Sequence, residues 1–357
     1  MTTTKPLTFG IIGAGLMGKR RALSIMAALG TKILLVADTS LEKAQALAQQ
    51  CDCDATTDAD ALVARADIDC VIVCTTTEHL AKYTIAALAH GKHVLVEKPL
   101  AMRLDDARAV VAAAERATGK IVKVGFNHRY LPTIMKAAEL YAGGNGAIGK
   151  LMFIKATYGQ KGRIGYEKEW RAFTAHGGGE LLDQGVHVLD LCARFMGPLD
   201  PKTTRGIAER LFWGGDADDN AFFVVKNVAG VPASIHVSSS LWRNTFRFEM
   251  QGTLGRIEIE GIRSHYGAPK LTLLTRNEQK SADVGVYQFD EQVFTFPDED
   301  TTWTREMESF LASVRDGAPV DGSPREALEA LEVVFALHAN NVHANNAVGP
   351  RGNGGHP

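Results

Sequence analysis

Short apolar runs alternate with longer helical patterns through the first third of the chain. The apolar runs are nearly continuous, as in strands that are covered on both faces. They span Leu7–Ile12, Lys32–Ala37, Cys70–Cys74, His93–Glu97 and Ile121–Phe126. Alanine- and leucine-rich stretches lie between them, and two of these, Glu78–His90 and Asp105–Thr118, end at a glycine. This alternation predicts an α/β domain over residues 1–125, with a doubly wound parallel sheet.

The pattern changes in the second part of the chain. Ala233–Trp242 alternates apolar and polar residues, which predicts a half-buried antiparallel strand. The alternation recurs in Phe246–Gln251, Gly255–Gly261 and Lys270–Arg276, and two helical patterns follow at Trp303–Arg315 and Pro324–Asn340. We therefore expect a second, α+β domain over residues 126–344 with a large open antiparallel sheet, with the late helices free to pack back on the first domain.

Composition excludes several classes of protein. Hydrophobic residues make up 45% of the 357 positions and charged residues 22%, which is typical of a folded protein with a real core. The formal charge is −2 and the basic residues are scattered, so no nucleic-acid or anionic-membrane surface is indicated. The tail 345–357 is rich in Asn, Gly and Pro, and we expect it to be disordered.

The cysteines and the first residues bear on the cellular compartment. Five cysteines without C-x-x-C spacing argue against a disulfide framework and against a zinc site, so no metal is expected. Met1–Pro6 resembles neither a signal peptide nor a twin-arginine leader, and no stretch of about 18 apolar residues occurs. The cytoplasm is the expected compartment.

A glycine motif follows the first predicted strand. Gly13, Gly15 and Gly18 have G-x-G-x-x-G spacing and open a predicted helix. In this setting the first glycine permits a tight turn, the second lets backbone N–H groups reach a pyrophosphate, and the third allows close helix–strand packing. The predicted cofactor contacts therefore include the residues between the glycines, Leu16 and Met17.

Asp38 stands 20 residues after Gly18, at the end of the second predicted strand. A carboxylate there can accept hydrogen bonds from the ribose hydroxyls of NAD, and it would repel the 2′-phosphate of NADP. No arginine adjoins Asp38, so NAD is favoured over NADP. The alternative is an ordinary tight turn beside a solvated aspartate.

Lys98 lies in the Glu97-Lys98-Pro99 segment, at the end of the predicted strand His93–Glu97. The carboxyl edge of an open α/β sheet is where ligands bind, so this lysine is expected to face the nicotinamide region. The alternative is a solvated surface lysine, which is the norm for this residue type.

A second polar group occurs in the run from Gly177 to Asp190, where a glycine hinge leads into a helical pattern. Asp183 and His187 are i,i+4 neighbours, and Asp190 follows three residues later, so all three are predicted to share one face of a helix. A histidine beside a carboxylate can remove a hydroxyl proton as hydride leaves the same carbon. The alternative is a buried, hydrogen-bonded structural histidine.

Four motifs together resemble the glucose–fructose oxidoreductase, inositol dehydrogenase and MocA family along nearly the whole chain. They are the G-x-G-x-x-G motif, Glu97-Lys98-Pro99, the segment Gly125-Phe126-Asn127-His128-Arg129-Tyr130, and the G-G-G-x-L-x-D-x-G-x-H-x-x-D run that ends at Asp190. The resemblance implies a Rossmann domain followed by an α/β domain whose open sheet forms dimer or tetramer contacts, and a cis peptide before Pro99. It also implies that His187 is the acid/base, while Lys98 and Asp183 orient the substrate hydroxyls.

Further site residues follow from the resemblance. Family members commonly have T-P-x-x-x-H at the end of the strand that corresponds to Cys70–Cys74. This chain reads Thr75-Thr76-Thr77-Glu78-His79-Leu80 there, without the proline and with the histidine displaced by one position. Thr75, Thr76, His79, Glu97 and Lys98 complete the expected cofactor set. The expected substrate set is Asn127, His128, Tyr166, Trp170 and Arg171, and the Trp170-Arg171 pair resembles a W-R pair of many members.

The expected function is NAD-dependent hydride transfer to or from a secondary alcohol or ketone of a sugar, sugar derivative or cyclitol. A lyase or glycosidase that oxidises its substrate only transiently would use the same residues, and the absence of net NADH would identify it. A non-catalytic NAD-binding regulator would not need Lys98, Asp183 and His187 together. The expected partners are the sugar-like substrate and a second copy of the chain.

Overall fold

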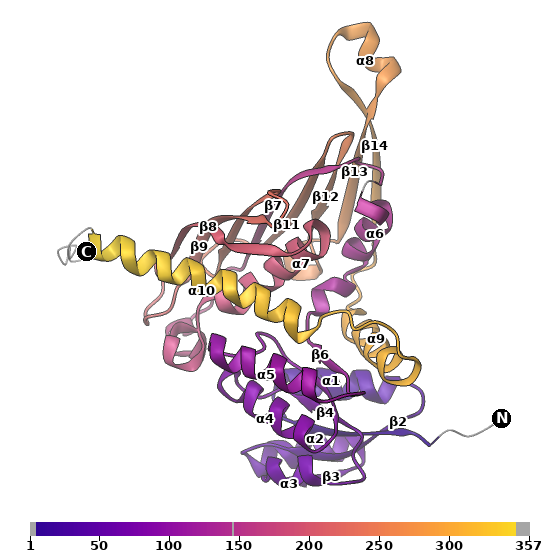
Figure 1. Ribbon diagram of the computed structural model, residues 1–357, viewed down its shortest axis with the longest axis vertical. Helices are drawn as coiled ribbons and strands as arrows, with labels where there is room; N and C mark the ends of the chain where they lie inside the picture. The colour runs from indigo at the N-terminus through magenta and orange to yellow at the C-terminus, as the bar shows by residue number, and fades with distance from the viewer. Residues whose placement is uncertain (1–4, 145, 348–357) are drawn as a thin grey trace. The chain divides into compact units, whose positions relative to one another are not determined.

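The computed structural model describes residues 5–144 and 146–347 (Figure 1). The chain forms two compact units, one made of Met1–Met135 and Asp298–Leu328 and the other of Lys136–Pro297 and Glu329–Pro357. Of the tail expected to be disordered, residues 345–347 complete helix α10 (Pro324–Ala347), and residues 348–357 lie outside the described residues.

The first unit contains a parallel sheet of six strands in the order β3-β2-β1-β4-β5-β6, which confirms the predicted doubly wound sheet. The edge strand β3 was not predicted, because it is only three residues long and carries no apolar run. The strands are β1 (Leu7–Ile12), β2 (Thr31–Ala37), β3 (Asp54–Thr56), β4 (Cys70–Val73), β5 (His93–Val96) and β6 (Val122–Val124). The helices are α1 (Leu16–Ala27), α2 (Leu41–Cys51), α3 (Ala59–Ala64), α4 (Thr77–Ala89), α5 (Leu104–Arg116) and α9 (Thr302–Asp316).

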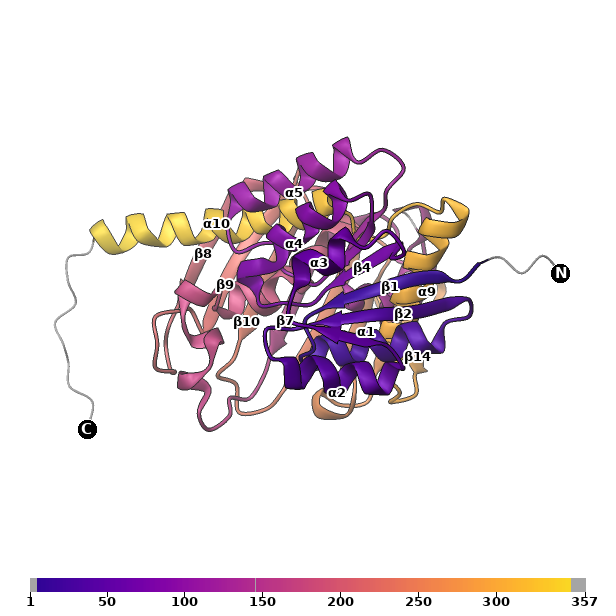
Figure 2. The same ribbon diagram turned by 90° about the horizontal axis from the view of Figure 1, so that it is seen from below.

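Helix α9 completes the core of the first unit, although it follows the second sheet in sequence. Met307, Phe310, Leu311 and Val314 have the i, i+3, i+4, i+7 spacing of one helix face, and they pack with residues of α1, α2 and the sheet. Helices α3, α4 and α5 lie on the other side of the sheet from α1 and α2 (Figure 2). The chain between residues 298 and 328 therefore belongs to the first unit.

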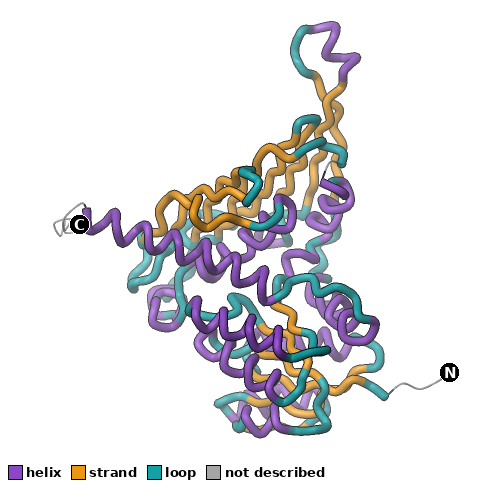
Figure 3. The backbone as a smooth tube through the Cα atoms, in the orientation of Figure 1, coloured by secondary structure: helices purple, strands orange, loops and turns teal. Residues whose placement is uncertain are grey.

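The second unit contains eight strands in the order β14-β13-β12-β11-β7-β10-β9-β8. Figure 3 draws the strands of both units in orange. The predicted purely antiparallel sheet is wrong in one place, because β10 runs parallel to β7 and antiparallel to β9. The alternation of apolar and polar residues is the same whether a strand pairs in parallel or antiparallel, so the pattern could not show this. The strands are β7 (Leu151–Gly159), β8 (Leu199–Glu209), β9 (Asn220–Asn227), β10 (Pro232–Ser238), β11 (Thr245–Gly252), β12 (Gly255–Glu260), β13 (Lys270–Asn277) and β14 (Gln288–Thr295).

The inner face of this sheet is apolar and carries helix α7 (Val186–Met196). Ile235 and Val237 of β10 point inward, as their alternation predicts, and Phe195 of α7 packs on Phe248 of β11 with ring centroids 5.8 Å apart. The hairpin of β13 and β14 extends to helix α8 (Glu278–Val284) at its end (Figure 1). Helix α6 (Pro132–Leu140) precedes β7. Across the described ranges, no helix is long and apolar enough to span a bilayer.

Candidate active site

The glycine motif forms a tight turn between β1 and α1. Gly13 has φ of +104°, and a Cβ atom there would lie 2.5 Å from the carbonyl oxygen of Cys74. A Cβ atom on Gly18 would lie 1.9 Å from the carbonyl oxygen of Gly13, whereas one on Gly15 would have no heavy atom within 4 Å. Close packing therefore requires glycine at positions 13 and 18. Gly15 instead faces open space at the start of α1, as a pyrophosphate site needs. Leu16 and Met17 are the first two residues of that helix.

Asp38 holds the glycine turn against the end of β2. Its Oδ2 accepts a hydrogen bond from the Ala14 amide at 2.8 Å, and its Oδ1 accepts one from the Ser40 amide at 2.9 Å. The residue is only half-buried. A carboxylate offers about four lone-pair positions, so two remain for the hydroxyls of a ribose. Asp38 thus combines a structural contact with the capacity to bind a nucleoside.

The residues after β4 also lie at the carboxyl edge of the first sheet. Thr75 donates its hydroxyl hydrogen to the carbonyl oxygen of Thr76 at 3.1 Å, and Thr76 immediately precedes α4. His79, in the first turn of α4, is exposed and lies edge-on to Tyr83 at 6.4 Å. Because β4 is adjacent to β1 in the sheet, these residues and the glycine turn share one edge.

The Glu97-Lys98-Pro99 segment follows β5, and the Lys98–Pro99 peptide is cis, as the family resemblance implies. Glu97 is buried, and its Oε1 accepts a hydrogen bond from Nε of Arg21 at 2.7 Å. Lys98 is half-buried at the end of the strand. The glutamate therefore faces the interior of the unit, while the lysine side chain is partly accessible.

Arg21 joins this segment to two other elements. It is fully buried on α1, and its Nη1 contacts Oε2 of Glu306 on α9 at 2.5 Å. A Cβ atom on Gly125 would lie 2.6 Å from Nη2 of Arg21, which explains the glycine that begins the Gly125–Tyr130 motif. Arg21 was not predicted from the sequence, because it is one of three consecutive basic residues with no mark of burial.

Asn127 and His128 lie in a 3₁₀ turn (Asn127–Tyr130) of the first unit and are buried. Nδ2 of Asn127 donates to the hydroxyl oxygen of Thr302 at 3.1 Å, and Nδ1 of His128 lies 3.1 Å from Oδ1 of Asn127. These contacts attach the turn to the start of α9. The two expected substrate residues therefore have partners within their own unit.

Three glycines precede the helical run of the second unit. Gly177 and Gly179 have φ of +72° and +110°, and a Cβ atom on Gly178 would lie 2.4 Å from the carbonyl oxygen of Arg171. The glycines thus allow a closely packed turn, where the sequence suggested a flexible hinge. The run then begins as a π-helical turn, Leu181–Gly185, before α7 starts at Val186. The predicted regular helix, with Asp183 and His187 one α-turn apart, is interrupted there, because a π turn contains more than 3.6 residues.

Asp183 is paired with one of the expected substrate residues. It is buried in the π turn, and its Oδ2 accepts a hydrogen bond from Nε of Arg171 at 2.9 Å. The Arg171 guanidinium also lies over the ring of Trp170, 4.5 Å from its centroid, and 3.5 Å from Glu169. Hydrogen bonding from Arg163 lowers the pKa of Glu169, so this carboxylate is charged at neutral pH. The structure therefore brings Trp170, Arg171 and Asp183 together.

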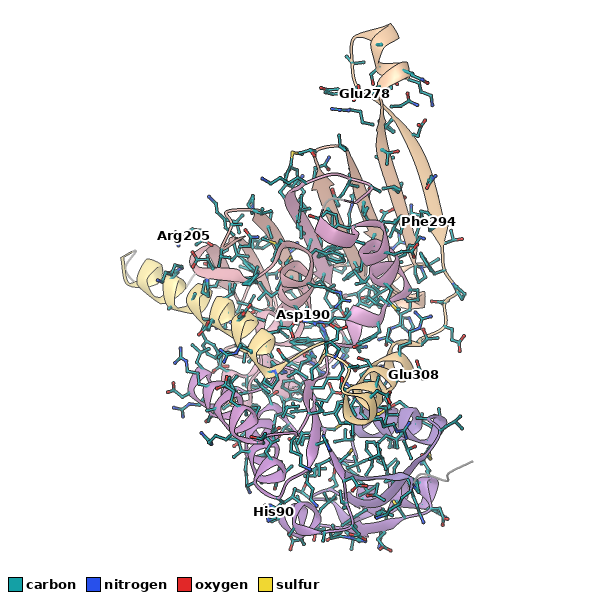
Figure 4. All side chains as sticks on the ribbon, turned by 45° about the vertical axis from the view of Figure 1, so that its right-hand side comes forward. His90, Asp190, Arg205, Glu278, Phe294 and Glu308 are labelled. Atoms are coloured by element: carbon teal, nitrogen blue, oxygen red, sulfur yellow. The ribbon has the colours of Figure 1, made fainter. Side chains whose placement is uncertain are left out.

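His187 and Asp190 are buried on α7, and Figure 4 shows Asp190 among surrounding side chains, unlike Glu278 on the projecting hairpin. Tyr166 is also buried, and its ring lies 5.0 Å from that of Trp213. Burial raises the pKa of Tyr166, so its phenol stays protonated at neutral pH and can donate a hydrogen bond. The second unit thus offers an imidazole, a carboxylate–guanidinium pair and a phenol, the groups that recognise and deprotonate a hydroxyl compound.

An acidic loop that was not predicted from the sequence organises this region. Asp216 accepts from the Thr174 amide at 2.8 Å, and Asp218 accepts from the Leu181 amide at 2.9 Å. Asp219 accepts from three successive amides, those of Leu211, Phe212 and Trp213, at 2.8, 2.8 and 2.7 Å. The signal was present in the sequence Gly214-Gly215-Asp216-Ala217-Asp218-Asp219, since aspartates after glycines often bind backbone amides in turns.

Two family models match the chain. Residues 7–126 match the model described as an oxidoreductase family with an NAD-binding Rossmann fold, and residues 134–258 match the GFO/IDH/MocA C-terminal domain. The two matches follow one another along the sequence.

Individual proteins agree with these models. The chain is 32% identical over 252 residues to 1,5-anhydro-D-fructose reductase of Ensifer adhaerens, covering 70% of this chain and 74% of that protein. It is 26% identical over 338 residues to inositol 2-dehydrogenase of Rhizobium meliloti strain 1021, covering 92% of this chain and 94% of that protein. The fold matches a levoglucosan dehydrogenase solved with NADH and levoglucosan, with a TM-score of 0.82 at 22% identity over 95% of this chain and 98% of that one.

Proposed function

Because the chain belongs to the GFO/IDH/MocA family of NAD-binding oxidoreductases, we propose that it transfers a hydride between NAD and a secondary alcohol or ketone of a sugar, sugar derivative or cyclitol. The observation that carries this proposal is the glycine turn held by Asp38, with open space at Gly15. The relatives that reduce or oxidise anhydrosugars and inositols support the substrate class.

The first unit supplies the cofactor contacts in this proposal. The open face at Gly15 and the amides at the start of α1 would hold the pyrophosphate, and the free lone pairs of Asp38 would receive the ribose hydroxyls. Thr75, Thr76 and His79 lie at the same sheet edge. When bound, NAD supplies the carbon that accepts the hydride.

Each reacting group of the protein has a separate part. In the direction of oxidation, His187 takes the hydroxyl proton of the substrate while the hydrogen on the same carbon leaves with both electrons of its bond as hydride. Asp183, oriented by the hydrogen bond from Arg171, accepts a hydrogen bond from a substrate hydroxyl or from the imidazole. Lys98 donates a hydrogen bond to the substrate oxygen and stabilises negative charge that develops there.

The experiment is a screen of substrates with the purified chain and NAD. Inositols, aldoses, uronic acids, anhydrosugars and nucleotide sugars would each be tested for NADH formation and for a changed carbohydrate product. The proposal expects NADH and ketone in equal amounts from at least one compound. A changed product without net NADH would instead indicate transient oxidation, as in a lyase or glycosidase, and NAD binding without any turnover would contradict an enzymatic role.

We also propose that a second copy of the chain packs on the outer face of the second sheet. Ile207, Phe222 and Val224 are exposed there on β8 and β9, more than a solvated sheet face needs. Toward the middle of the sheet, Arg247 is ion-paired with Glu249 of the same strand and Glu258 of the next one. Apolar residues beside a strip that contains both charges can complement an identical face in a two-fold dimer.

A further inference from the structure

The start of the helical run in the second unit is held by a carboxylate that lies far from it in sequence. Asp218 belongs to the loop between β8 and β9, and its side chain is only 7% exposed. Its Oδ2 accepts a hydrogen bond from the Leu181 amide at 2.9 Å, and its main-chain oxygen accepts one from the Glu180 amide at 2.9 Å. The first amides of a helix have no partner within the helix, so Asp218 satisfies two groups that would otherwise be unpaired.

Gly179 is the residue that admits this carboxylate. A Cβ atom on Gly179 would lie 2.5 Å from Oδ1 of Asp218, and its φ of +110° disfavours any side chain. The carbonyl oxygen of Gly179 in turn accepts a hydrogen bond from the amide of Asp183 at 2.9 Å. A single hydrogen bond therefore connects the turn that Asp218 holds to the backbone of Asp183.

The other side of the carboxylate is held by α10. Nε2 of His338 lies 3.1 Å from Oδ1 of Asp218, and Nδ2 of Asn340 donates to the carbonyl oxygen of Thr204 on β8 at 3.1 Å. All of these residues belong to the second unit. Asp218 is thus fixed between a long helix and the turn that begins the π segment.

We propose that Asp218, held by His338, is a positioning residue that sets the placement of Asp183 and His187 for the reaction. This inference rests on the proposed function, since it assigns the acid/base role to His187. The directions of the side chains in the π turn depend on how the turn begins. Each residue of a helical turn rotates the next side chain about the helix axis, so a shift of the first amides is passed on to Asp183 and His187. A misplacement of about 1 Å in a reacting group can lower a rate by roughly 10²-fold, so the hold on this turn has kinetic consequences.

Asp216 offers a matched control in the same loop. Its carboxylate also accepts a hydrogen bond from a backbone amide, that of Thr174 at 2.8 Å, and from the Thr174 hydroxyl at 3.0 Å. Both of these contacts are to Thr174, which precedes the glycines of the turn. Asp216 is exposed, so its removal tests the loss of a carboxylate–amide contact in the same loop without releasing the start of the π turn.

The test compares Asp218→Ala, Asp218→Asn, His338→Gln and Asp216→Ala in the full chain. Hydrogen exchange of peptides that cover residues 179–186 reports the hold on the turn, and NAD affinity and steady-state kinetics report its use. We expect Asp218→Ala to exchange faster in these peptides and to lose kcat by about 10- to 100-fold with an unchanged dissociation constant for NAD. Asp218→Asn keeps one oxygen as an acceptor, so it should retain most of the wild-type kcat. The kcat of His338→Gln should lie between those of Asp218→Asn and wild type. The kcat of Asp216→Ala should stay within about 3-fold of wild type.

Several outcomes overturn the inference. Unchanged exchange at residues 179–186 in Asp218→Ala would show that the carboxylate does not hold the turn. Faster exchange with wild-type kcat, or an equal loss in Asp216→Ala, would show that the hold has only a structural role. Should Asp218→Ala fail to fold, hydrogen exchange in Asp218→Asn and His338→Gln decides the question, because exchange at residues 179–186 that is unchanged in both variants would refute the hold on the turn. A wild-type chain that turns over none of the tested compounds refutes the proposed function and with it the kinetic role, while the exchange experiment still shows whether Asp218 holds the turn.

Discussion

Arg21 on α1 and Glu97 beside Lys98 are joined by a buried hydrogen bond of 2.7 Å. The same guanidinium contacts Glu306 of α9, so one cation lies between two carboxylates. Burial raises the pKa of Glu306, and the charge of Arg21 opposes that change. Arg21 thus connects three elements: α1, which begins at the glycine turn, the segment that carries Lys98, and α9.

Replacing Arg21 with Met is expected to lower the free energy of unfolding by about 3 to 5 kcal/mol, because two buried carboxylates lose their counter-charge. Urea denaturation measures this change. The triple variant Arg21→Met, Glu97→Gln, Glu306→Gln removes all three charges and should be more stable than the single variant. A single variant within about 1 kcal/mol of wild type would contradict the assigned role of this network.

Replacing Asp38 with Asn is expected to narrow the preference for NAD over NADP, because the variant removes like-charge repulsion toward a 2′-phosphate. The Asn oxygen can still accept the hydrogen bond from Ala14, which keeps the glycine turn in place. Calorimetric titration of both dinucleotides measures the two affinities. In wild type, NADP binding as tight as NAD binding would refute the role of Asp38 in selection. Asp38→Ala loses the Ala14 contact as well and should bind both dinucleotides more weakly than Asp38→Asn.

Replacing His187 with Ala is expected to lower kcat by about 10² to 10⁴, the usual contribution of a general acid/base. NAD affinity should stay nearly constant, since the glycine turn and Asp38 belong to the other unit. A general base acts only when it is deprotonated, so the rate of oxidation in wild type should depend on pH and the variant should lose this dependence. Full activity with an unaltered pH profile would show that His187 is structural. Lys98→Ala should change both KM and kcat.

Lys123 is expected to make stability depend on pH in the alkaline range. Burial lowers its pKa to about 8, although Nζ donates a hydrogen bond to the Tyr130 hydroxyl at 2.7 Å. The pKa of a lysine in the unfolded chain is about 10.4. Between pH 8 and this pKa, Lys123 binds more protons in the unfolded chain than in the folded one, so its contribution to the free energy of unfolding rises with pH. Relative to Lys123→Met, wild type should gain about 2 kcal/mol in free energy of unfolding from pH 7.5 to 9.5. An equal pH dependence in the two proteins would contradict the lowered pKa.

Introducing charge on the outer face of the second sheet is expected to prevent self-association. Phe222→Glu places a carboxylate where we propose that a second copy packs, whereas Leu29→Glu makes the same kind of change at an exposed site of the first unit. Light scattering should show a mass of at least twice 38.5 kDa for wild type and Leu29→Glu, and a mass of 38.5 kDa for Phe222→Glu. A monomeric wild type at micromolar concentration would refute the dimer.

The sequence by itself determined the features whose causes are local. The apolar runs of the first sheet, the glycine turn and its distance to Asp38 occur in short, continuous segments, so spacing alone predicted strand, turn and helix. The strands β1, β2, β4, β5 and β6 could therefore be predicted in sequence order. The amphipathic stripe of α9 was also readable, but the pattern of a helix does not say which core it covers.

Only the tertiary structure decided which distant residues meet. The contact of Arg21 with Glu306 spans 285 positions and that of His338 with Asp218 spans 120, and neither leaves a local pattern in the sequence. The parallel pairing of β7 with β10 is of the same kind, because alternation fixes the buried face of a strand and not its neighbour. The glycines at 125 and 179 show the physical reason most directly. Each is required by a side chain from elsewhere in the fold, Arg21 in one case and Asp218 in the other, which packs where a Cβ atom would be.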